Sequence, residues 1–243
     1  MEVFIIKKLL SLIKDADSTI IFTGAGMSTE SGLPDFRSKD RGLWEKFNPT
    51  ELANVNAITT NKNEFIKFYQ YRLSEIDQYQ PHTGHKILAE WEKSKLIEGI
   101  ITQNVDGFHT AAGSVNVMEL HGSFKDLHCH DCHKNVSRIA YLSGKIQCEC
   151  GGTIRPGIVL FGENLPQKTF QNAELATNKA TLFIVLGSSL SVTPANMFPM
   201  LAKENGAKLV IVNREPTELD PFADLLIQNI QIKELLIQLN KYL

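Results

Sequence analysis

The sequence predicts an α/β protein built on a parallel sheet with helices on both faces. Six apolar runs of strand length alternate with helical patterns over most of the chain, and this alternation is typical of a parallel sheet covered by helices. Two stretches interrupt it: residues 39–80 are mostly helical by pattern, and residues 124–157 are rich in cysteine, histidine, glycine and lysine. These observations predict one sheet-based domain that carries two excursions.

The expected strands end at glycine or polar residues. In chain order they are Ser18–Phe22, Leu96–Thr102, Val117–Leu120, Leu182–Leu186, Lys208–Val212 and Leu225–Ile227. Ligands of parallel sheets bind outside the carboxyl ends of the strands, which is where Gly24, Asn104, His121, Gly187 and Asn213 fall. Within a single domain of residues 1–243, we expect residues 1–38, 81–123 and 158–243 to form the sheet part, 39–80 a helical excursion and 124–157 a separate module.

The overall composition excludes several classes of protein. A chain of 243 residues with 43% hydrophobic residues can bury a full core. The net charge is −2 and basic residues are spread along the chain, so we expect no direct binding to nucleic acid. The first ten residues fit an amphipathic helix without the order of a signal peptide, and no apolar run has transmembrane length. We therefore expect a cytoplasmic monomer that binds no membrane.

A glycine turn follows the first expected strand. Gly24, Ala25 and Gly26 come directly after a β-branched run, and such a turn presents backbone N–H groups that bind nucleotide phosphates. Thr29 stands where the dinucleotide-binding fingerprint has its third glycine, so the glycines alone also fit an ordinary strand-to-helix turn. Together with the strand pattern, the turn favours a Rossmann-like sheet.

All four cysteines lie within one short stretch. Cys129 and Cys132 form one close pair, and Cys148 and Cys150 form a second pair with one intervening residue. Four thiolates at this spacing favour tetrahedral Zn²⁺ in a small zinc-ribbon module, and a closed four-thiolate site is structural because it leaves no position for water. The alternative is that a neighbouring histidine replaces one cysteine as a ligand.

Five sets of residues extend over nearly the whole chain: Gly24–Arg37, Thr102–His109, Glu119–Gly122, the four cysteines and Gly187–Ser189. In this order they resemble the sirtuins, which are NAD-dependent protein-lysine deacylases. The resemblance implies that the carbonyl oxygen of an acylated lysine attacks the anomeric carbon of the nicotinamide ribose of NAD. The products it implies are nicotinamide, 2′-O-acyl-ADP-ribose and free lysine.

His121, at the end of a short expected strand, is the expected general base. A histidine near neutrality can take a proton from a sugar hydroxyl, and the resemblance gives His121 this role on the ribose. It also implies that Asn104 and Gln103 hold the ribose, that Asp106 hydrogen-bonds the nicotinamide carboxamide and that Val105 packs on the ring. His121, Asn104 and Asp106 are thus the expected catalytic residues.

The resemblance assigns a larger set of residues to NAD. Those at 35–37 would close over the nicotinamide end, and those at 187–189 and 213–214 would face phosphate and the adenosine ribose. The full set is Gly24, Ala25, Gly26, Thr29, Asp35, Phe36, Arg37, Gln103, Asn104, Val105, Asp106, His121, Gly187, Ser188, Ser189, Asn213 and Arg214.

The segment Ile158–Glu163 resembles the one with which sirtuins pair an extended acylated-lysine peptide through main-chain hydrogen bonds. Val159, Phe161 and Gly162 are the substrate-binding residues expected there.

Tyr69 and Arg72, in the pattern Phe-Tyr-x-x-Arg, resemble the branch that removes succinyl and malonyl groups. Ala53 resembles the small residue that widens its acyl pocket. An arginine with a tyrosine hydroxyl can hold a distal carboxylate, so we expect removal of acetyl and of acidic acyl groups. The alternative is that both are exposed helix residues, with Arg72 pairing with Glu75 or Asp77.

Two other functions remain as alternatives. One is a protein mono-ADP-ribosyltransferase, and the other is a non-catalytic module that binds NAD or interacts through its zinc ribbon. The presence of His121 and of the complete peptide segment favours the deacylase.

Overall fold

The computed structural model describes residues 2–35 and 48–243. Within these residues the main sheet has six parallel strands in the order β3-β2-β1-β6-β7-β8. The strands are β1 (Thr19–Thr23), β2 (Gly99–Thr102), β3 (Val117–Glu119), β6 (Leu182–Leu186), β7 (Lys208–Val212) and β8 (Leu225–Ile227). Counted along the chain this order is 3-2-1-4-5-6, which is that of the Rossmann fold and confirms the predicted sheet.

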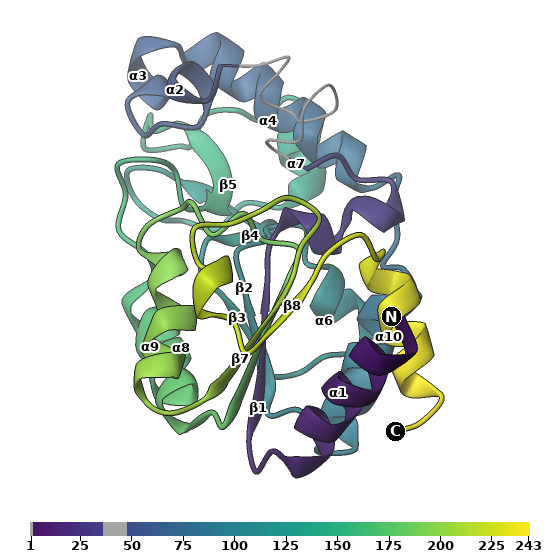
Figure 1. The fold of residues 1–243 in the computed structure, drawn as a ribbon. Helices are drawn as coiled ribbons and strands as arrows, with labels where there is room; N and C mark the ends of the chain where they lie inside the picture. The colour runs from purple at the N-terminus through teal and green to yellow at the C-terminus, as the bar shows by residue number, and fades with distance from the viewer. Residues whose placement is uncertain (1, 36–47) are drawn as a thin grey trace.

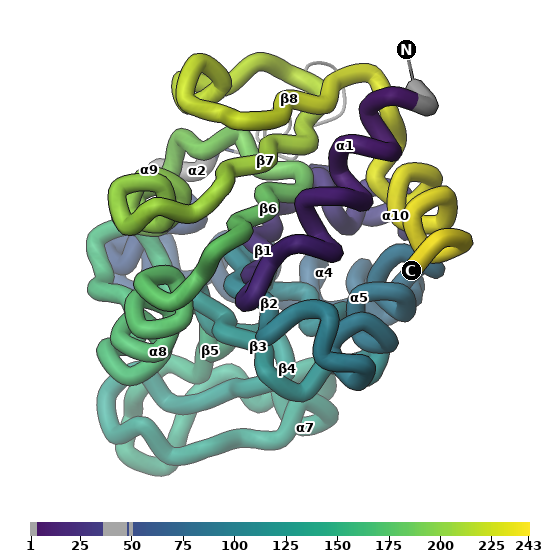
Figure 2. Tube along the Cα trace, turned by 60° about the horizontal axis from the view of Figure 1, so that its bottom comes forward, coloured from purple at the N-terminus to yellow at the C-terminus, as the bar shows by residue number. Residues whose placement is uncertain are grey.

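Helices cover both faces of the sheet (Figure 1). On one face, α1 (Glu2–Asp15), α5 (Thr83–Lys93) and α10 (Ile232–Asn240) bury their apolar sides against alternate strand residues such as Ile21 and Ile184. On the other, α8 (Gln167–Lys179) and α9 (Phe198–Glu204) pack on the residues between them, such as Phe22 and Phe183. Figure 2 shows the sheet between these two layers. The strand sequences are almost continuously apolar because both faces are buried.

The second expected strand starts three residues later than predicted. Leu96 belongs to the turn that ends α5, and Ile97 and Glu98 connect this turn to the strand. The N–H of Leu96 donates to the Trp91 carbonyl, and Lys95 has a φ of 63°. This is the hydrogen-bond pattern that ends many helices with a left-handed residue, so β2 begins at Gly99.

A smaller region lies beyond the carboxyl ends of the sheet strands, at the top of Figure 1. It contains α2 (Pro49–Leu52), α3 (Ala57–Thr60), α4 (Lys62–Ile76) and α7 (Arg138–Leu142), with the antiparallel strands β4 (Gly122–Cys129) and β5 (Ile154–Ile158). Their apolar side chains form one core, which includes Phe65, Leu73, Phe124, Tyr141 and Ile154. The sequence pattern identified no strands here, because β4 and β5 have exposed and half-buried residues in no clear alternation.

Short segments complete the fold. They are the 3-10 helices η1 (Ala25–Met27), η2 (Thr29–Ser31), η4 (Ala195–Met197) and η5 (Asp220–Phe222), and the helix α6 (Phe108–Ala112). None of the helices within residues 2–35 and 48–243 combines the length and the apolar character that crossing a bilayer requires.

The strand order reverses between β1 and β6. The turn at Gly24–Gly26 after β1 contacts Gly187 after β6 at this point. Gly24 N–H donates to the Leu186 carbonyl at 3.1 Å, and Gly26 N–H donates to the Gly187 carbonyl at 2.9 Å. A Cβ on Gly24 would lie 2.7 Å from the Gly187 oxygen, and Gly187 has a φ of 63°. Only glycine permits this close backbone approach, which opens a ligand crevice at the switch point.

Candidate functional site

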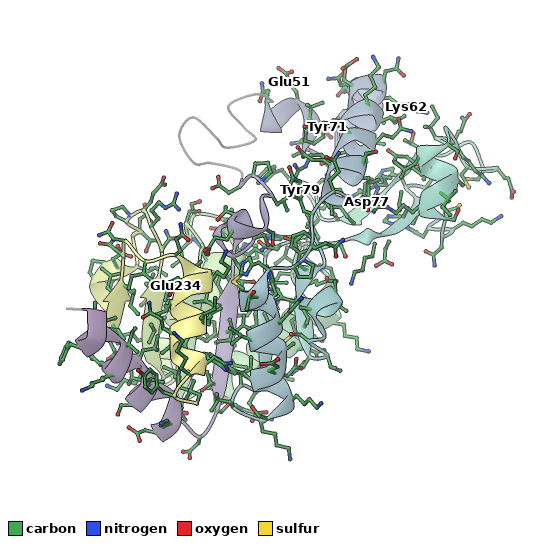
Figure 3. All side chains as sticks on the ribbon, turned by 90° about the vertical axis from the view of Figure 1, so that its right-hand side faces the viewer. Glu51, Lys62, Tyr71, Asp77, Tyr79 and Glu234 are labelled. Carbon is green, nitrogen blue, oxygen red and sulfur yellow. The ribbon has the colours of Figure 1, made fainter. Side chains whose placement is uncertain are left out.

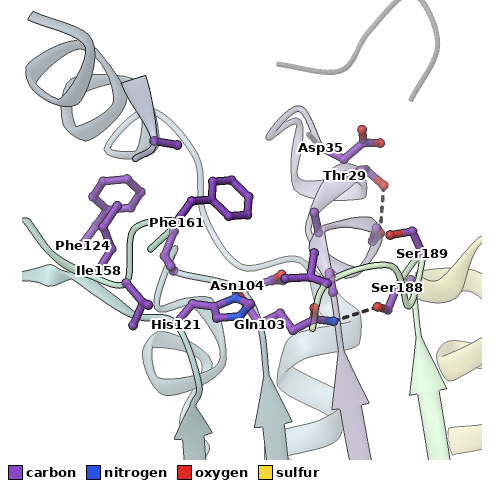
Figure 4. A pocket seen from close by; sticks show the side chains of 18 of the residues that line it. Thr29, Asp35, Gln103, Asn104, His121, Phe124, Ile158, Phe161, Ser188 and Ser189 are labelled. Atoms are coloured by element: carbon purple, nitrogen blue, oxygen red, sulfur yellow. Dashed lines mark hydrogen bonds between the residues drawn. The ribbon is translucent and has the colours of Figure 1, made fainter. Parts of the chain in front are cut away.

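A cavity of about 340 Å³ lies at the carboxyl ends of the strands. Its lining comes from the sheet edge on one side and from α4 and the segment 158–163 on the other. All five residues expected at the strand ends line it: Gly24, Asn104, His121, Gly187 and Asn213. Figure 4 shows the polar side chains from the strand ends with the apolar side chains Phe124, Ile158 and Phe161 across from them.

The glycine turn forms the floor of the cavity beside Ser188 and Ser189. Gly24, Ala25 and Gly26 line the cavity, and the Thr29 hydroxyl donates to the Gly26 carbonyl at 3.0 Å (Figure 4). The threonine side chain at this position therefore stabilises the turn through a hydrogen bond to its backbone. Backbone at a strand end with no side chains in the way suits the diphosphate of a dinucleotide.

Gln103 and Asn104 are fixed by the turns on either side of them. The Gln103 Nε2 donates to the Ser188 hydroxyl at 2.8 Å, and the Asn104 Nδ2 donates to the Gly24 carbonyl at 3.0 Å. Asn104 is 5% exposed. The half-buried Gln103 amide and the buried Asn104 amide thus give the cavity polar groups with fixed orientation.

His121 follows β3 and points towards the chain at Gln103 (Figure 4). Its Nδ1 lies 3.0 Å from the Gln103 carbonyl oxygen. A carbonyl only accepts hydrogen bonds, so Nδ1 carries the proton and the neutral ring keeps its basic lone pair on Nε2. The fold thus sets the tautomer that a general base needs.

Asp106 does not line the main cavity. It lines a much smaller one with Ser28, Ala25 and Val105, of which Ala25 and Val105 also line the main cavity. Its carboxylate accepts from the Ser28 hydroxyl at 2.7 Å and from the Phe108 N–H at 2.8 Å, while burial raises its pKa. Ser28 was not singled out from the sequence, although it stands within the glycine-rich segment.

One part of the cavity lining is formed by Tyr69 and Arg72 of α4, together with Ala53, Phe68 and Phe124. Tyr69 is 3% exposed, and burial raises the pKa of its phenol. Both residues of the expected clamp therefore reach one compartment.

Arg72 is 2% exposed and its Nη1 lies 2.6 Å from the Glu75 Oε2. The pairing with Glu75 that the sequence left as the alternative is present, and Arg72 nevertheless lines the cavity. Asp77 instead accepts a hydrogen bond from Arg138 at 2.7 Å.

The segment Ile158–Glu163 borders the cavity along its whole length. The Val159 N–H donates to the His121 carbonyl at 2.8 Å, and the Phe161 N–H donates to the Ala53 carbonyl at 2.8 Å. These two N–H groups are used within the chain, so a bound peptide has to pair with other main-chain groups of the segment.

A buried ion pair fixes the turn at the end of this segment. Arg155 is 3% exposed; its guanidinium holds both carboxylate oxygens of Glu163 and also donates to the Ile158 and Pro156 carbonyls. The N–H of Leu160 donates to Glu163 at 2.8 Å. Sequence reasoning gave Arg155 no role, because its partner lies eight residues away.

The remaining predicted residues divide into two groups. Asp35, Ser189, Arg214 and Gly162 line the main cavity. Phe36 and Arg37 lie outside the described residues. Glu30 and residues 230–232 also line the cavity and were not predicted; Glu30 accepts from the N–H of Lys233 at the start of α10, a contact between distant segments.

The four cysteine sulfur atoms come together, all within 4.8 Å of one another. Cys129 and Cys150 lie 3.5 Å apart, and Cys132 and Cys148 lie 3.7 Å apart. A tetrahedral Zn²⁺ with Zn–S bonds of about 2.3 Å needs sulfur atoms about 3.8 Å apart, so the cluster fits one zinc ion. Among the described residues no histidine joins the cluster.

Comparisons with known proteins agree with this geometry. A model of the Sir2 family matches residues 24–194. A protein of Geobacillus kaustophilus named NAD-dependent protein deacetylase 1 is 55% identical over 225 residues, covering 93% of each chain. The NAD-dependent protein deacetylase of Oceanobacillus iheyensis is 54% identical over 224 residues, covering 92% of this chain and 95% of the relative.

Solved structures of Sir2 proteins have the same fold. One that contains a deacetylated p53 peptide and 3′-O-acetyl ADP ribose superposes with a TM-score of 0.91 at 37% identity, covering 97% of both chains. Another, with a p53 peptide and NAD⁺, has a TM-score of 0.87 at 36% identity and the same coverage. A third is bound to a propionylated peptide, with a TM-score of 0.88 at 35% identity and 97% coverage of both chains.

Proposed function

The chain belongs to the Sir2 family and is an NAD-dependent protein deacetylase, and from this premise we propose that it also removes succinyl and malonyl groups from lysine side chains. One observation carries the proposal: a single cavity joins the glycine turn and His121 to a compartment that contains Tyr69 and Arg72. The substrates are acylated-lysine proteins or peptides. The second product is 2′-O-acyl-ADP-ribose.

We propose that the glycine turn and Ser188–Ser189 bind the diphosphate of NAD, while Gln103 and Asn104 orient the nicotinamide ribose. When bound, NAD supplies the activated anomeric carbon that the acyl oxygen attacks, with nicotinamide as the leaving group. His121 accepts a proton from a ribose hydroxyl at Nε2, and Nδ1 keeps its hydrogen bond to the Gln103 carbonyl. Phe124 and Phe161 give this part of the cavity an apolar wall.

The small cavity beside the main one would hold the nicotinamide carboxamide. Asp106 accepts a hydrogen bond from the Ser28 hydroxyl there, and Val105 lines both cavities. We propose that Asp106 accepts from the carboxamide and Val105 packs on the ring. Phe36 and Arg37 remain predicted contacts to the same end of NAD.

Cys129, Cys132, Cys148 and Cys150 would hold a zinc ion, and its role would be structural because four thiolates leave no position for water. We propose that residues 124–157 form the zinc-binding module, residues 39–80 the helical excursion and the remainder the NAD-binding part of one catalytic domain. We also propose a cytoplasmic monomer that does not bind nucleic acid directly, which the net charge of −2 and the scattered basic residues support.

Arg72 and Tyr69 distinguish acidic acyl groups from acetyl in this proposal. A guanidinium and a phenol together donate to a carboxylate at the end of a succinyl or malonyl chain, whereas acetyl has no such group. The clamp is built on α4, a helix of 15 residues. Its position is therefore rigid relative to the core of the small region.

The test is mass spectrometry of one peptide that carries acetyl-lysine or succinyl-lysine, incubated with NAD and protein. We expect loss of the acyl group with matching acyl-ADP-ribose, and no turnover by His121→Ala. Arg72→Met should reduce desuccinylation at least tenfold more than deacetylation, since a charge-assisted bond contributes about 1.5–3 kcal/mol. Lys67→Met, at an exposed position of the same helix, is the control.

Equal losses of both activities in Arg72→Met would contradict the clamp. ADP-ribose attached to protein in place of free acyl-ADP-ribose would indicate the transferase. Binding of NAD without turnover of either peptide by folded, zinc-loaded protein would indicate a non-catalytic module.

A further inference from the structure

Arg72 enters the acyl compartment already paired with a carboxylate of its own helix. Its Nη1 is 2.6 Å from the Glu75 Oε2, and the side chains of Arg72 and Glu75 are 3% and 15% exposed. Glu75 itself does not line the cavity. We infer that Glu75 determines acyl specificity. Its carboxylate neutralises Arg72, so the compartment accepts neutral acyl groups. The same carboxylate competes with the carboxylate of an acidic acyl group for Arg72. This inference rests on the proposed role of Arg72 as the acyl clamp.

Glu75 is held in this position from its other side. The Tyr71 hydroxyl donates to the Glu75 Oε1 at 2.8 Å, so each carboxylate oxygen has a partner on α4. The spacings are i, i+4 and i, i+3, at which side chains on a helix meet. Figure 3 shows Tyr71 on this helix, and its side chain is 49% exposed. The hydrogen bond to Glu75 raises the pKa of Tyr71.

The pairing has opposite consequences for the two classes of substrate. A neutral acetyl group brings no charge to the buried Arg72 guanidinium, and a buried charge that lacks enough opposite charge around it is costly. Glu75 removes that cost. A succinyl carboxylate, in contrast, comes close to Glu75 when it binds Arg72, and two carboxylates sharing one guanidinium repel each other.

The second buried arginine near the compartment cannot replace Arg72. Arg155 and Glu163 both lie close enough to influence the pKa of Tyr69. The Arg155 guanidinium, however, is bound by both oxygens of Glu163 and by two main-chain carbonyls. The Arg72–Glu75 pair lies within a single helix, so a substitution of Glu75 changes the charge beside the Arg72 guanidinium directly.

The experiment compares Glu75→Gln with the unmodified protein on the same peptide carrying acetyl-lysine or succinyl-lysine. Glutamine keeps an acceptor for Arg72 and removes only the charge. We expect the succinyl-to-acetyl ratio of kcat/KM to rise about tenfold, with a corresponding gain in succinyl-peptide affinity measured by calorimetry without NAD. Glu64→Gln is the matched control, because Glu64 forms an i, i+3 pair with Lys67 at 2.9 Å on the exposed face of the same helix.

An unchanged or lowered ratio in Glu75→Gln would overturn the inference, since Glu75 would then be inert or would position Arg72 for the acidic group. If Glu75→Gln does not fold, Tyr71→Phe carries the test, with a rise of about threefold expected and no rise overturning it. Arg72→Met separates the two proposals. If it lowers desuccinylation selectively while Glu75→Gln has no effect, the clamp stands and the role of Glu75 fails.

Discussion

The two sides of the cavity are held in place by different interactions. On the sheet side, backbone hydrogen bonds fix the site, such as Gly26 N–H to the Gly187 carbonyl, and buried amides complete it. On the other side, side chains do this work: the Arg155–Glu163 and Arg72–Glu75 pairs and the four cysteines. The difference teaches that the sheet side depends on close backbone approach at glycines such as Gly24, whereas the side formed by α4 and the segment 158–163 also depends on charged side-chain pairs and can change with a few substitutions.

Removal of zinc should disturb the side of the cavity that side chains hold in place, and should leave the sheet side intact. We expect deacylation to fall on the order of 100-fold, because metal-binding energy in a small module is folding energy. Hydrogen exchange should increase in β4 and β5, whose ladder pairs Cys129 with Ile154, and remain low in β1 and β6. Restoring zinc is the control. Unchanged protection of β4 after removal of the metal would show that the module is stable without it.

Arg155→Lys should weaken the ion pair that holds the segment 158–163 in place. Lysine keeps the charge but cannot hold both oxygens of Glu163 and the two carbonyls at once. We expect the KM for the acylated peptide to rise about tenfold while the KM for NAD stays within about twofold, as peptide and NAD contact different sides of the cavity. Steady-state kinetics with each substrate varied in turn measures both values.

Arg138→Lys is the control for this prediction. Arg138 also joins elements of the small region, through the carbonyls of Leu73 and Phe124, but it does not line the cavity. An equal rise in both KM values for Arg155→Lys would mean that the pair supports the fold in general rather than the peptide segment.

The smallest expected effect concerns a cluster of three histidines, His82, His85 and His109, next to the end of β1. His85 contacts His82 and His109, with ring centroids 4.3 Å and 5.0 Å apart, and His109 Nε2 lies 3.0 Å from the Thr23 hydroxyl at the end of β1. Burial lowers the pKa of His85 to about 2 and that of His109 to about 3. The folded state keeps both rings neutral, whereas the unfolded chain protonates them below about pH 6.5. Stability from this cluster is therefore complete above about pH 6.5 and decreases as the pH falls.

His85→Leu should weaken that pH dependence. Neither nitrogen of His85 has a hydrogen-bond partner among the described residues, so leucine loses no bond. Between pH 7.5 and pH 5 we expect the loss of unfolding free energy to be about 2 kcal/mol smaller than in the unmodified protein. Urea unfolding at the two pH values measures this difference. An identical loss in both proteins would show that other groups account for the acid sensitivity.

The sequence alone determined the local elements and the chemistry that follows directly from them. Each of the six main strands is a run of apolar residues, and sheets buried on both faces need such runs. The four cysteines are close in the chain, and their spacing is typical of a zinc site. The residues at the strand ends were predictable because the carboxyl ends of parallel strands share one edge.

The tertiary structure decided what depends on residues distant in the chain or on the choice between partners. It produced β4 and β5, whose irregular burial pattern comes from packing against α4 and α7. It placed Asp106 in the lining of a small second cavity, and it brought Arg155 into an ion pair with Glu163. For Arg72 the sequence offered a carboxylate clamp or a partner in its own helix, and the fold pairs Arg72 with Glu75 while it also places Arg72 in the lining of the cavity.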